Sequence, residues 1–298
     1  MQETLRGYVD LLRLHFFFAW PLLFCSGYLL ATGIYGNFSW IDLLKAALIG
    51  FFGFEAGFVL NDYIDREYDK FDIEKNRLTR YWRPFGTRPI PAGLVSPQTA
   101  LGLFFVLVLL AALLIATFPF PHSLYALLIM GVSYLLEAFY QIKKRKEVYP
   151  VAQLAGRIDF ALFPVAGYLI AGFPDTTVFF YFLFFYPFAM AHLGTNDLID
   201  LPNDRSRGLN TITTLYGLKG TATWIAVFTV IHAAFALIFM TRLGWIGRAG
   251  LLSGLVLLSV ANGVIIKQKS PESALKVLPL FHVTMLIYAL SIAVDSVV

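Results

Sequence analysis

Long runs of apolar residues recur along almost the whole chain, and they constrain its fold more than any other feature. The run LGLFFVLVLLAALLIATF is one example. A helix of roughly 18 or more apolar residues is long enough to cross the hydrocarbon core of a bilayer. Inside lipid, backbone polar groups must be satisfied within the protein, which leaves helices or a closed barrel. Because these runs lack the polar alternation of a barrel strand, the sequence predicts an all-α polytopic membrane protein.

The composition agrees with this class. Of 298 residues, 58% are hydrophobic and only 14% are charged, whereas a soluble domain carries about 25% charged residues. Cys25 is the only cysteine, so the chain has no internal disulfide. No segment between the apolar runs is long enough to fold alone, and we expect residues 1–298 to form a single membrane-embedded domain.

We expect nine membrane-spanning helices. They are predicted at residues 10–35, 41–65, 97–119, 123–141, 150–172, 176–199, 221–241, 247–267 and 275–297. Basic residues gather in the loops after the second, fourth and sixth helices, which by the positive-inside rule are cytoplasmic. The sequence therefore predicts a multi-pass protein of the cell membrane with a cytoplasmic N-terminus.

An acidic pattern, Asn-Asp-x-x-Asp-x-x-x-Asp, occurs twice, at the ends of the second and sixth predicted helices. Residues four apart lie on one face of a helix, and similarity at matching points of two halves often marks a shared site in membrane proteins. The matching residues are Asn61, Asp62, Asp65 and Asp69 in the first motif and Asn196, Asp197, Asp200 and Asp204 in the second. Pro202 lies within the second motif, and we expect it to end the helix near Asp200.

Carboxylate and amide oxygens are ligands that suit Mg²⁺. A plain alternative is that these acids are solvated helix ends, but helix C-termini favour cations over anions. Mg²⁺ is commonly shared between carboxylates and substrate phosphates, so two acidic motifs beside basic loops indicate a bound diphosphate. The expected metal ligands are Asn61, Asp62, Asp65, Asp69, Asp197, Asp200 and Asp204.

Together these residues resemble the UbiA superfamily of membrane-embedded prenyltransferases. Its first motif, Asn-x-x-x-Asp-x-x-x-Asp, matches Asn61, Asp65 and Asp69, and its second, Asp-x-x-x-Asp, matches Asp200 and Asp204. The stretches TRPIPAGLVS and FYQIKKRK are also similar to family segments.

The resemblance implies a bundle of nine helices around a central cavity. It also implies Mg²⁺-dependent ionisation of an allylic prenyl diphosphate and capture of the prenyl cation by an acceptor. It assigns catalysis to Asp65, Asp69, Asp200 and Asp204. The expected diphosphate-binding residues are Asn61, Arg77, Arg88 and Lys144, with Arg83 as a rival arginine.

Several further ionisable residues fall within apolar segments, where such groups usually face the bundle interior. Glu55, Glu137 and Arg157 are of this kind, and His192 lies one helical turn before Asn196. For His192, a packed and hydrogen-bonded histidine is the commoner interpretation. The expected substrate-binding residues are Tyr140, Arg157 and Asn196.

Two other functions compete with prenyl transfer. A secondary transporter would use the acidic repeat as a cation site, but such sites favour the bilayer midplane. A phosphatidyl-type transferase lacks support because its Asp-Gly-rich signature is absent. The expected partners are a prenyl diphosphate, membrane lipid and an acceptor that is an aromatic or quinone precursor, a porphyrin or a glycerol-phosphate lipid. No nucleic-acid partner is expected.

Overall fold

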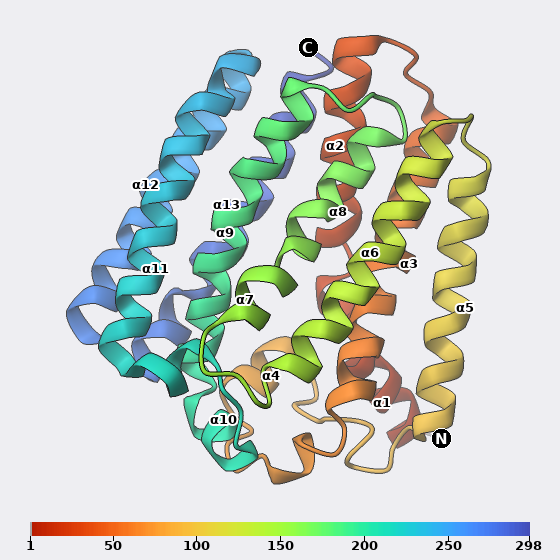
Figure 1. The fold of residues 1–298 in the computed structure, drawn as a ribbon. Coiled ribbons are helices and arrows are strands. Elements are labelled where there is room, and N and C mark those ends of the chain that lie inside the picture. Colours follow the sequence, from red (N-terminus) through yellow and green to blue (C-terminus); the bar gives the residue numbers. More distant parts are fainter. Residues whose placement is uncertain (1) are drawn as a thin grey trace.

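The computed structural model describes residues 2–298, and within that range it contains helices and no strands, which confirms the all-α prediction. Long helices run side by side as a bundle (Figure 1). The C-terminus lies at one end of the bundle, and the N-terminus lies at the other. Three short helices gather at the N-terminal end: α1 (Gln2–Leu11), α4 (Leu78–Trp82) and α10 (Leu201–Arg207).

Eight segments of residues 2–298 are long and apolar enough to cross a membrane. They contain α2 (Ala19–Tyr35), α3 (Trp40–Asp65), α5 (Pro97–Ala116), α6 (His122–Lys143), α9 (Thr176–Ile199), α11 (Ile212–Phe239), α12 (Trp245–Gln268) and α13 (Pro271–Asp295). The short turns η1 (Leu14–Phe16) and η3 (Met240–Arg242) extend α2 and α11. The ninth predicted span is present as two shorter helices in series, α7 (Val151–Gly156) and α8 (Ile158–Leu169).

Two predicted helices are interrupted, and an arginine lies at each break. The segment 10–35 breaks at Arg13, whose backbone is left-handed with a φ of 47°. The segment 150–172 breaks at Arg157. Each arginine pairs with buried carboxylates on other helices, Arg13 with Asp62 and Arg157 with Glu137. These tertiary ion pairs leave no trace in the apolar periodicity, so the sequence did not predict the breaks.

Most predicted helix boundaries agree with the structure to within a few residues. Side-chain caps define several of the starts: Ser39, Ser96, Asp175 and Ser270 each accept a hydrogen bond from the backbone N–H three residues later. The seventh span departs most, because α11 begins at Ile212 rather than 221 and contains a kink at Gly217. The kink needs a φ of 67°, which glycine adopts without steric cost.

Helix α9 lies at the centre of the bundle. In its apolar 18-residue stretch 67% of the residues are buried, compared with 17% in that of α6. Large buried aromatic residues pack it against α11 and α13, among them Phe184, Phe188 and Tyr288. On the other side, α2 and α8 approach closely at Gly27 and Gly167, where a Cβ atom would collide with the facing backbone.

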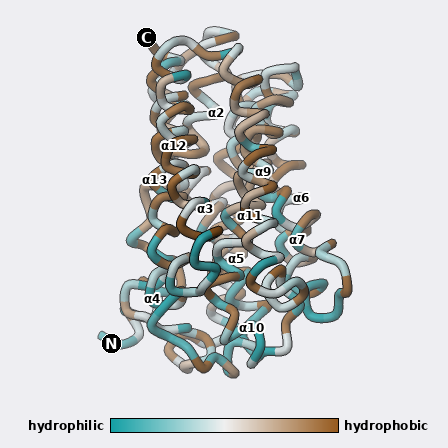
Figure 2. The backbone as a smooth tube through the Cα atoms, turned by 90° about the vertical axis from the view of Figure 1, so that its left-hand side faces the viewer, coloured by the Kyte–Doolittle hydropathy of each residue, from teal (hydrophilic) through white to brown (hydrophobic). Residues whose placement is uncertain are grey.

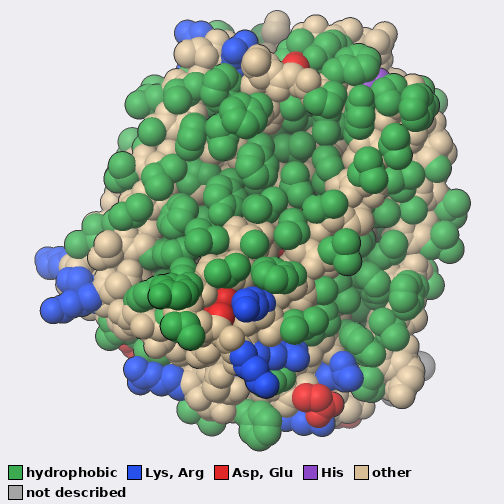
Figure 3. All heavy atoms as spheres, in the orientation of Figure 1, with side chains coloured by type: hydrophobic (Ala, Val, Ile, Leu, Met, Phe, Trp, Pro, Cys, Tyr) green, Lys and Arg blue, Asp and Glu red, His purple; other side chains and the backbone are tan. Residues whose placement is uncertain are grey.

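The long helices present an apolar belt to the surroundings, and polar residues collect at the N-terminal end. Figure 2 shows the hydrophilic part of the backbone around the N-terminus, α4 and α10. Figure 3 shows the same division on the surface, with hydrophobic side chains over most of the height and most lysines and arginines at this end. The protein is therefore a multi-pass membrane protein whose long loops and short helices form one polar end.

Candidate active site

Both acidic motifs lie at this polar end. In the first motif, α3 carries Asn61, Asp62 and Asp65 and ends there, and Asp69 follows in a 3₁₀ turn, η2 (Asp69–Phe71). In the second, α9 ends at Ile199, as Pro202 predicted. Asp200 then caps the short helix α10, which carries Asp204. The helical stripe expected for each motif is thus bent at its last turn.

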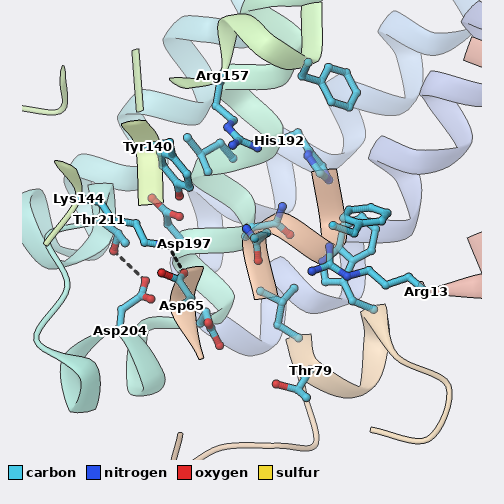
Figure 4. A pocket seen from close by; sticks show the side chains of 18 of the residues that line it. Arg13, Asp65, Thr79, Tyr140, Lys144, Arg157, His192, Asp197, Asp204 and Thr211 are labelled. Atoms are coloured by element: carbon cyan, nitrogen blue, oxygen red, sulfur yellow. Dashed lines mark hydrogen bonds and ion pairs between the residues drawn. The ribbon is translucent and has the colours of Figure 1, made fainter. Parts of the chain in front are cut away.

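The two motifs face a common cavity of about 200 Å³ between α3, α6, α9 and the polar-end loops. Figure 4 shows side chains from α6, α9 and the loops converging on it. We call it the first cavity. Ten of the predicted site residues line it: Asn61, Asp65, Arg88, Tyr140, Lys144, Arg157, Asn196, Asp197, Asp200 and Asp204.

Three predicted site residues do not line this cavity. Asp62 is buried and accepts hydrogen bonds from Arg83 at 2.7 and 2.8 Å and from Arg13 at 3.1 Å. Asp69 lies behind the cavity wall, with Arg88 2.8 Å away. Arg77 is paired with Glu272 and, unlike the rival loop arginines Arg83 and Arg88, does not line the first cavity.

In the first motif, lysine and arginine side chains hold the aspartates. The carboxylate of Asp65 lies 2.7 Å from Lys144 and 3.4 Å from Arg145. The Lys144 ammonium also lies 4.9 Å from the ring of Tyr140, a cation–π contact. These contacts place the ammonium of Lys144, in the segment after α6, directly at the end of α3.

In the second motif, the partners are mostly uncharged. Asp197 accepts the backbone N–H of Ile212 at 2.9 Å, and Asp204 accepts the hydroxyl of Thr211 at 2.8 Å. Asp200 accepts the Asn203 amide at 2.8 Å, and its nearest cation, Arg207, is 3.5 Å away. These carboxylates therefore keep lone pairs available on the cavity side.

Arg207 and Asp72 join the two motifs, and sequence reasoning missed both. Arg207, on α10, forms ion pairs with Asp69, Asp72 and Asp200. Arg88 binds Asp72 at 2.6 Å as well as Asp69. The only signal for Arg207 was its position three residues after Asp204, one helical turn. Nothing in the sequence singled out Asp72.

The concentrated charge shifts several pKa values at this end of the molecule. Burial raises the pKa of Asp69 to about 6, and Arg88 and Arg207 limit that rise. Burial also raises the pKa of Asp200 and of Asp204 above the usual range, with added repulsion between the acids at Asp204. Although burial opposes it, the pKa of Arg88 is raised by Asp69 and Asp72. The acids are thus short of compensating positive charge.

The site suits a metal that shares its coordination with a substrate. Within residues 2–298, no three Asp, Glu, His or Cys side chains converge closely enough to hold an ion alone. The carbonyl oxygen of the Asn196 side chain is buried without a hydrogen-bond partner. Carboxylates of both motifs line the same cavity. Mg²⁺ fits this donor set, because it binds through one or two carboxylates together with phosphate oxygens and water.

A second cavity adjoins the first on the side of α6 and α8. The two share a wall formed by Arg13, Phe54, Phe58, Asn61, Arg157 and Phe160. The polar part of the second cavity is held by Glu137, which accepts from Asn61 at 2.9 Å and is ion-paired with Arg157.

An apolar recess between α3, α5, α6 and α8 adjoins the second cavity. The lining residues shared by the cavity and the recess are Gly53, Ser133, Tyr134 and Phe163. The recess reaches Ile115 and Ala126, near the end of α5 and the start of α6. We call the cavity and the recess together the apolar path.

A model of the UbiA prenyltransferase family matches residues 18–287. Among curated proteins, digeranylgeranylglyceryl phosphate synthase of Korarchaeum cryptofilum is 26% identical over 274 residues, covering 91% of this chain and 90% of that protein. The 4-hydroxybenzoate octaprenyltransferase of Tolumonas auensis is 27% identical, covering 66% of this chain and 63% of that protein.

Solved structures share the fold. A UbiA homologue from Aeropyrum pernix K1 has a TM-score of 0.75 at 20% identity, covering 94% of this chain and 98% of that one. A homologue from Archaeoglobus fulgidus, solved with GPP and Mg²⁺, has a TM-score of 0.64 at 16% identity, covering 97% and 99%.

Proposed function

The chain belongs to the UbiA prenyltransferase family and is a membrane prenyltransferase, and we propose that it joins a geranylgeranyl group to a glycerol-phosphate lipid. The donor is an allylic prenyl diphosphate, and the acceptor is the free hydroxyl of a glyceryl phosphate that already carries one prenyl chain. The observation that carries the proposal is the apolar path, which gives a second lipid chain a place beside the reacting centre.

The diphosphate of the donor binds in the first cavity. Asp65, Asp197, Asp200 and Asp204 would hold Mg²⁺ there, with Asn61, Asn196 and Asp69 nearby. Bound Mg²⁺ supplies charge neutralisation for the departing diphosphate. Support for this metal comes from the hard-oxygen donor set and from the Archaeoglobus fulgidus homologue, whose structure contains GPP and Mg²⁺.

The cations at the cavity bind the remaining diphosphate oxygens. Lys144 and Arg88 both line the cavity. Asp65 holds Lys144 in place, and Asp69 and Asp72 hold Arg88. Arg207 also lines the cavity and reaches both motifs. Arginine suits phosphate because its fork of N–H donors binds two oxygens at once.

The prenyl cation forms beside aromatic side chains and away from water. Tyr140, Trp82, Phe58 and Phe160 line the first cavity, and aromatic faces stabilise a nearby cation electrostatically. A water-poor wall protects the cation from hydrolysis before the acceptor captures it.

The acceptor enters the second cavity with its polar head toward Arg13, Asn61 and Arg157 and its chain in the apolar path. Both arginines are available to an anionic head group, since each lines both cavities. The relative from Korarchaeum cryptofilum, named for a digeranylgeranylglyceryl phosphate product, aligns over nearly its whole length and supports this acceptor class.

A second candidate acceptor is 4-hydroxybenzoate, which the relative from Tolumonas auensis supports through its name. Its carboxylate would bind the same arginines, but its single ring leaves the apolar path unused.

We also propose that the polar end faces the cytoplasm, because the basic residues of Figure 3 collect there. Cysteine labelling from either side of sealed vesicles, at positions introduced into the loop after Lys143, tests this orientation.

The acceptor is tested by competition. Purified protein is given labelled geranylgeranyl diphosphate, Mg²⁺ and equal amounts of geranylgeranylglyceryl phosphate and 4-hydroxybenzoate. We expect label in the glycerolipid. Label found only in the hydroxybenzoate would contradict the proposal.

A matched pair of variants tests the apolar path. Gly53→Leu fills it, because a side chain there meets Phe163 and Tyr134 near 4 Å. Gly102→Leu places the same side chain on the exposed face of α5, where no atom lies within 4 Å. Only Gly53→Leu is expected to raise the KM for the glycerolipid, by about tenfold or more. A rise in the donor KM instead would place the donor chain in the path.

A further inference from the structure

Prenyl transfer releases a proton as well as diphosphate. When a prenyl group replaces the hydrogen of an acceptor O–H or ring C–H, the bond between the prenyl carbon and the diphosphate oxygen breaks. A carbon–oxygen or carbon–carbon bond forms in its place, and the acceptor hydrogen leaves as H⁺. A base is therefore useful wherever the acceptor lies, and this holds for either acceptor class.

Two histidines and a tyrosine form a hydrogen-bonded chain that ends at the first cavity. His192 Nε2, on α9, lies 3.1 Å from His282 Nε2, on α13. His282 Nδ1 lies 2.6 Å from the Tyr81 hydroxyl, on α4. His192 lines the first cavity, whereas Tyr81 is partly exposed on the polar-end loop. The chain thus connects the cavity with the polar end through three elements distant in sequence.

His192 lines the first cavity on the side of Arg157, one helical turn before Asn196 on α9. In Figure 4 it is near Arg157, toward the upper right, while Asp65, Asp197 and Asp204 are toward the lower left. Its Nδ1 has no hydrogen-bond partner within residues 2–298, although Nε2 has one. That free nitrogen belongs to a residue that lines the cavity where the acceptor must meet the donor.

Packing holds the rings of the chain in place. Phe188 stacks parallel to His192 at 6.5 Å, and Trp82 contacts both histidines. Tyr81 stacks on His282 at 5.4 Å. Besides His282, the ionisable groups around His192 are Arg157, which lines the same cavity, and His15, which binds the Tyr81 carbonyl.

The chain has two complete arrangements of protons. In one, Tyr81 donates to His282 Nδ1, and His282 Nε2–H donates to His192 Nε2. In the other, His192 Nε2–H donates to His282 Nε2, and His282 Nδ1–H donates to Tyr81. The second arrangement leaves His192 Nδ1 unprotonated and able to accept. Burial raises the pKa of Tyr81 to about 12, so near neutral pH its hydroxyl keeps a proton to pass on.

We propose that His192 is the catalytic base that accepts the acceptor's proton, and that His282 and Tyr81 relay it to the polar end. His192 Nδ1 takes the proton, and Nε2 gives its own to His282 Nε2. His282 Nδ1 then gives its proton to the Tyr81 oxygen, and the original Tyr81 hydroxyl proton passes to water. One proton enters and one leaves, and no oxidant or reductant takes part.

The contrast with His232 separates this role from simple packing. His232 is also buried among aromatic rings, but both its nitrogens are occupied, Nδ1 by the Phe184 carbonyl at 2.8 Å and Nε2 by Tyr288 at 3.0 Å. It lines neither cavity. His232→Gln is therefore a matched control for replacement of a buried histidine.

The test measures kcat, the donor KM and the pH profile of the full-length protein. It uses labelled geranylgeranyl diphosphate, Mg²⁺ and geranylgeranylglyceryl phosphate, or 4-hydroxybenzoate should the wild-type protein prefer it. Failure of the lipid acceptor with wild-type protein thus affects the proposed acceptor and leaves the base open to measurement. His192→Gln is expected to lower kcat by about 100-fold with little change in donor KM. The fall in wild-type kcat at acidic pH should disappear in this variant.

Further variants and a rescue experiment keep the test independent of folding. Tyr81→Phe retains the stacked ring and should lower kcat by about tenfold, as should His282→Gln. Added imidazole should partly restore His192→Ala, whereas His232→Gln should keep wild-type kcat. A His192→Gln protein with wild-type kcat and pH profile would overturn the proposal. So would a loss confined to donor KM, or an equal loss of kcat in His232→Gln.

Discussion

The two acidic motifs have nearly the same sequence but different surroundings. In the second motif, Asp197, Asp200 and Asp204 all line the first cavity and are held mainly by neutral donors. In the first motif, only Asp65 among the aspartates lines it.

The sharpest contrast is between the counterparts Asp62 and Asp197. Asp62 is enclosed by Arg83 and Arg13, whereas Asp197 accepts one backbone N–H and faces the cavity. The repeat therefore serves two purposes, since one half secures the basic loops and the other presents carboxylates to ligands. Similar sequence at matching helix ends did not reveal this division, which depends on where distant arginines lie.

The largest expected effect is on catalysis by the second motif. Asp200→Asn removes a cavity carboxylate and keeps the side chain's shape, and we expect kcat/KM to fall by about 10²–10³-fold. Steady-state transfer of labelled prenyl diphosphate measures it. Activity within a few-fold of wild type would show that the second motif does not bind the metal–diphosphate group.

The next largest effect is on stability, which a substitution in the first motif should lower more than the matching substitution in the second. Asp62→Asn leaves two buried arginines without full compensation, so the free energy of unfolding should fall by about 3 kcal/mol. Asp197→Asn removes no ion pair and should cost less than about 1 kcal/mol. Thermal unfolding in detergent followed by tryptophan fluorescence compares them. Equal losses would remove the structural distinction between the motifs.

Replacing an arginine of the loop after α3 should have a smaller effect, on the donor KM, and a second arginine of the same loop serves as the control. Arg88→Gln removes a guanidinium that lines the first cavity and would bind the diphosphate. A hydrogen bond to a charged group contributes about 1.5–3 kcal/mol, so we expect a 10- to 100-fold rise in donor KM. Arg77→Gln removes only a surface pair with Glu272 and should change donor KM less than about twofold. Similar losses in both variants would mean that donor binding depends on overall loop charge.

The smallest expected effect is a pH dependence of stability without metal or substrate. The folded pKa of Asp69, about 6, lies above that of the unfolded chain, so its stabilising effect is present at low pH and lost as pH rises through about 6. Asp200 and Asp204 act in the same direction. Asp69→Asn should therefore gain melting temperature relative to the wild type as pH rises from about 4 to about 7, because the variant lacks this loss. A difference between the two proteins that stays constant or shrinks over this range would contradict the assigned burial of Asp69.

Much of the fold was predictable because a helix that crosses the hydrocarbon core of a membrane needs a long run of apolar residues, which is visible in the sequence. Helices α3, α5 and α9 begin within one residue of the starts that the apolar runs predicted. Pro202 correctly predicted the end of α9. The breaks at Arg13 and Arg157 were missed, and both arginines pair with carboxylates distant in sequence, Asp62 and Glu137, 49 and 20 residues away. Local pattern carries no information about such partners.

The candidate site was predictable to a similar extent. Repetition of the motif identified eight residues, and six of them line the first cavity. Four further predicted residues that line it, Arg88, Tyr140, Lys144 and Arg157, came from the family resemblance or from their charge within apolar segments. The bridging roles of Arg207 and Asp72, and the hydrogen-bonded chain from His192 to Tyr81, depend on contacts between elements far apart in the chain. They became visible only when the bundle brought those elements together.

The division of labour between the motifs is tested most directly by donor binding in the counterpart variants. Titration calorimetry with a thiol-linked prenyl diphosphate analogue, with and without Mg²⁺, would compare Asp62→Asn and Asp197→Asn at a temperature where both are folded. We predict that Asp197→Asn loses most of the Mg²⁺-dependent affinity and that Asp62→Asn keeps most of it. Equal losses, or a greater loss in Asp62→Asn, would contradict the account.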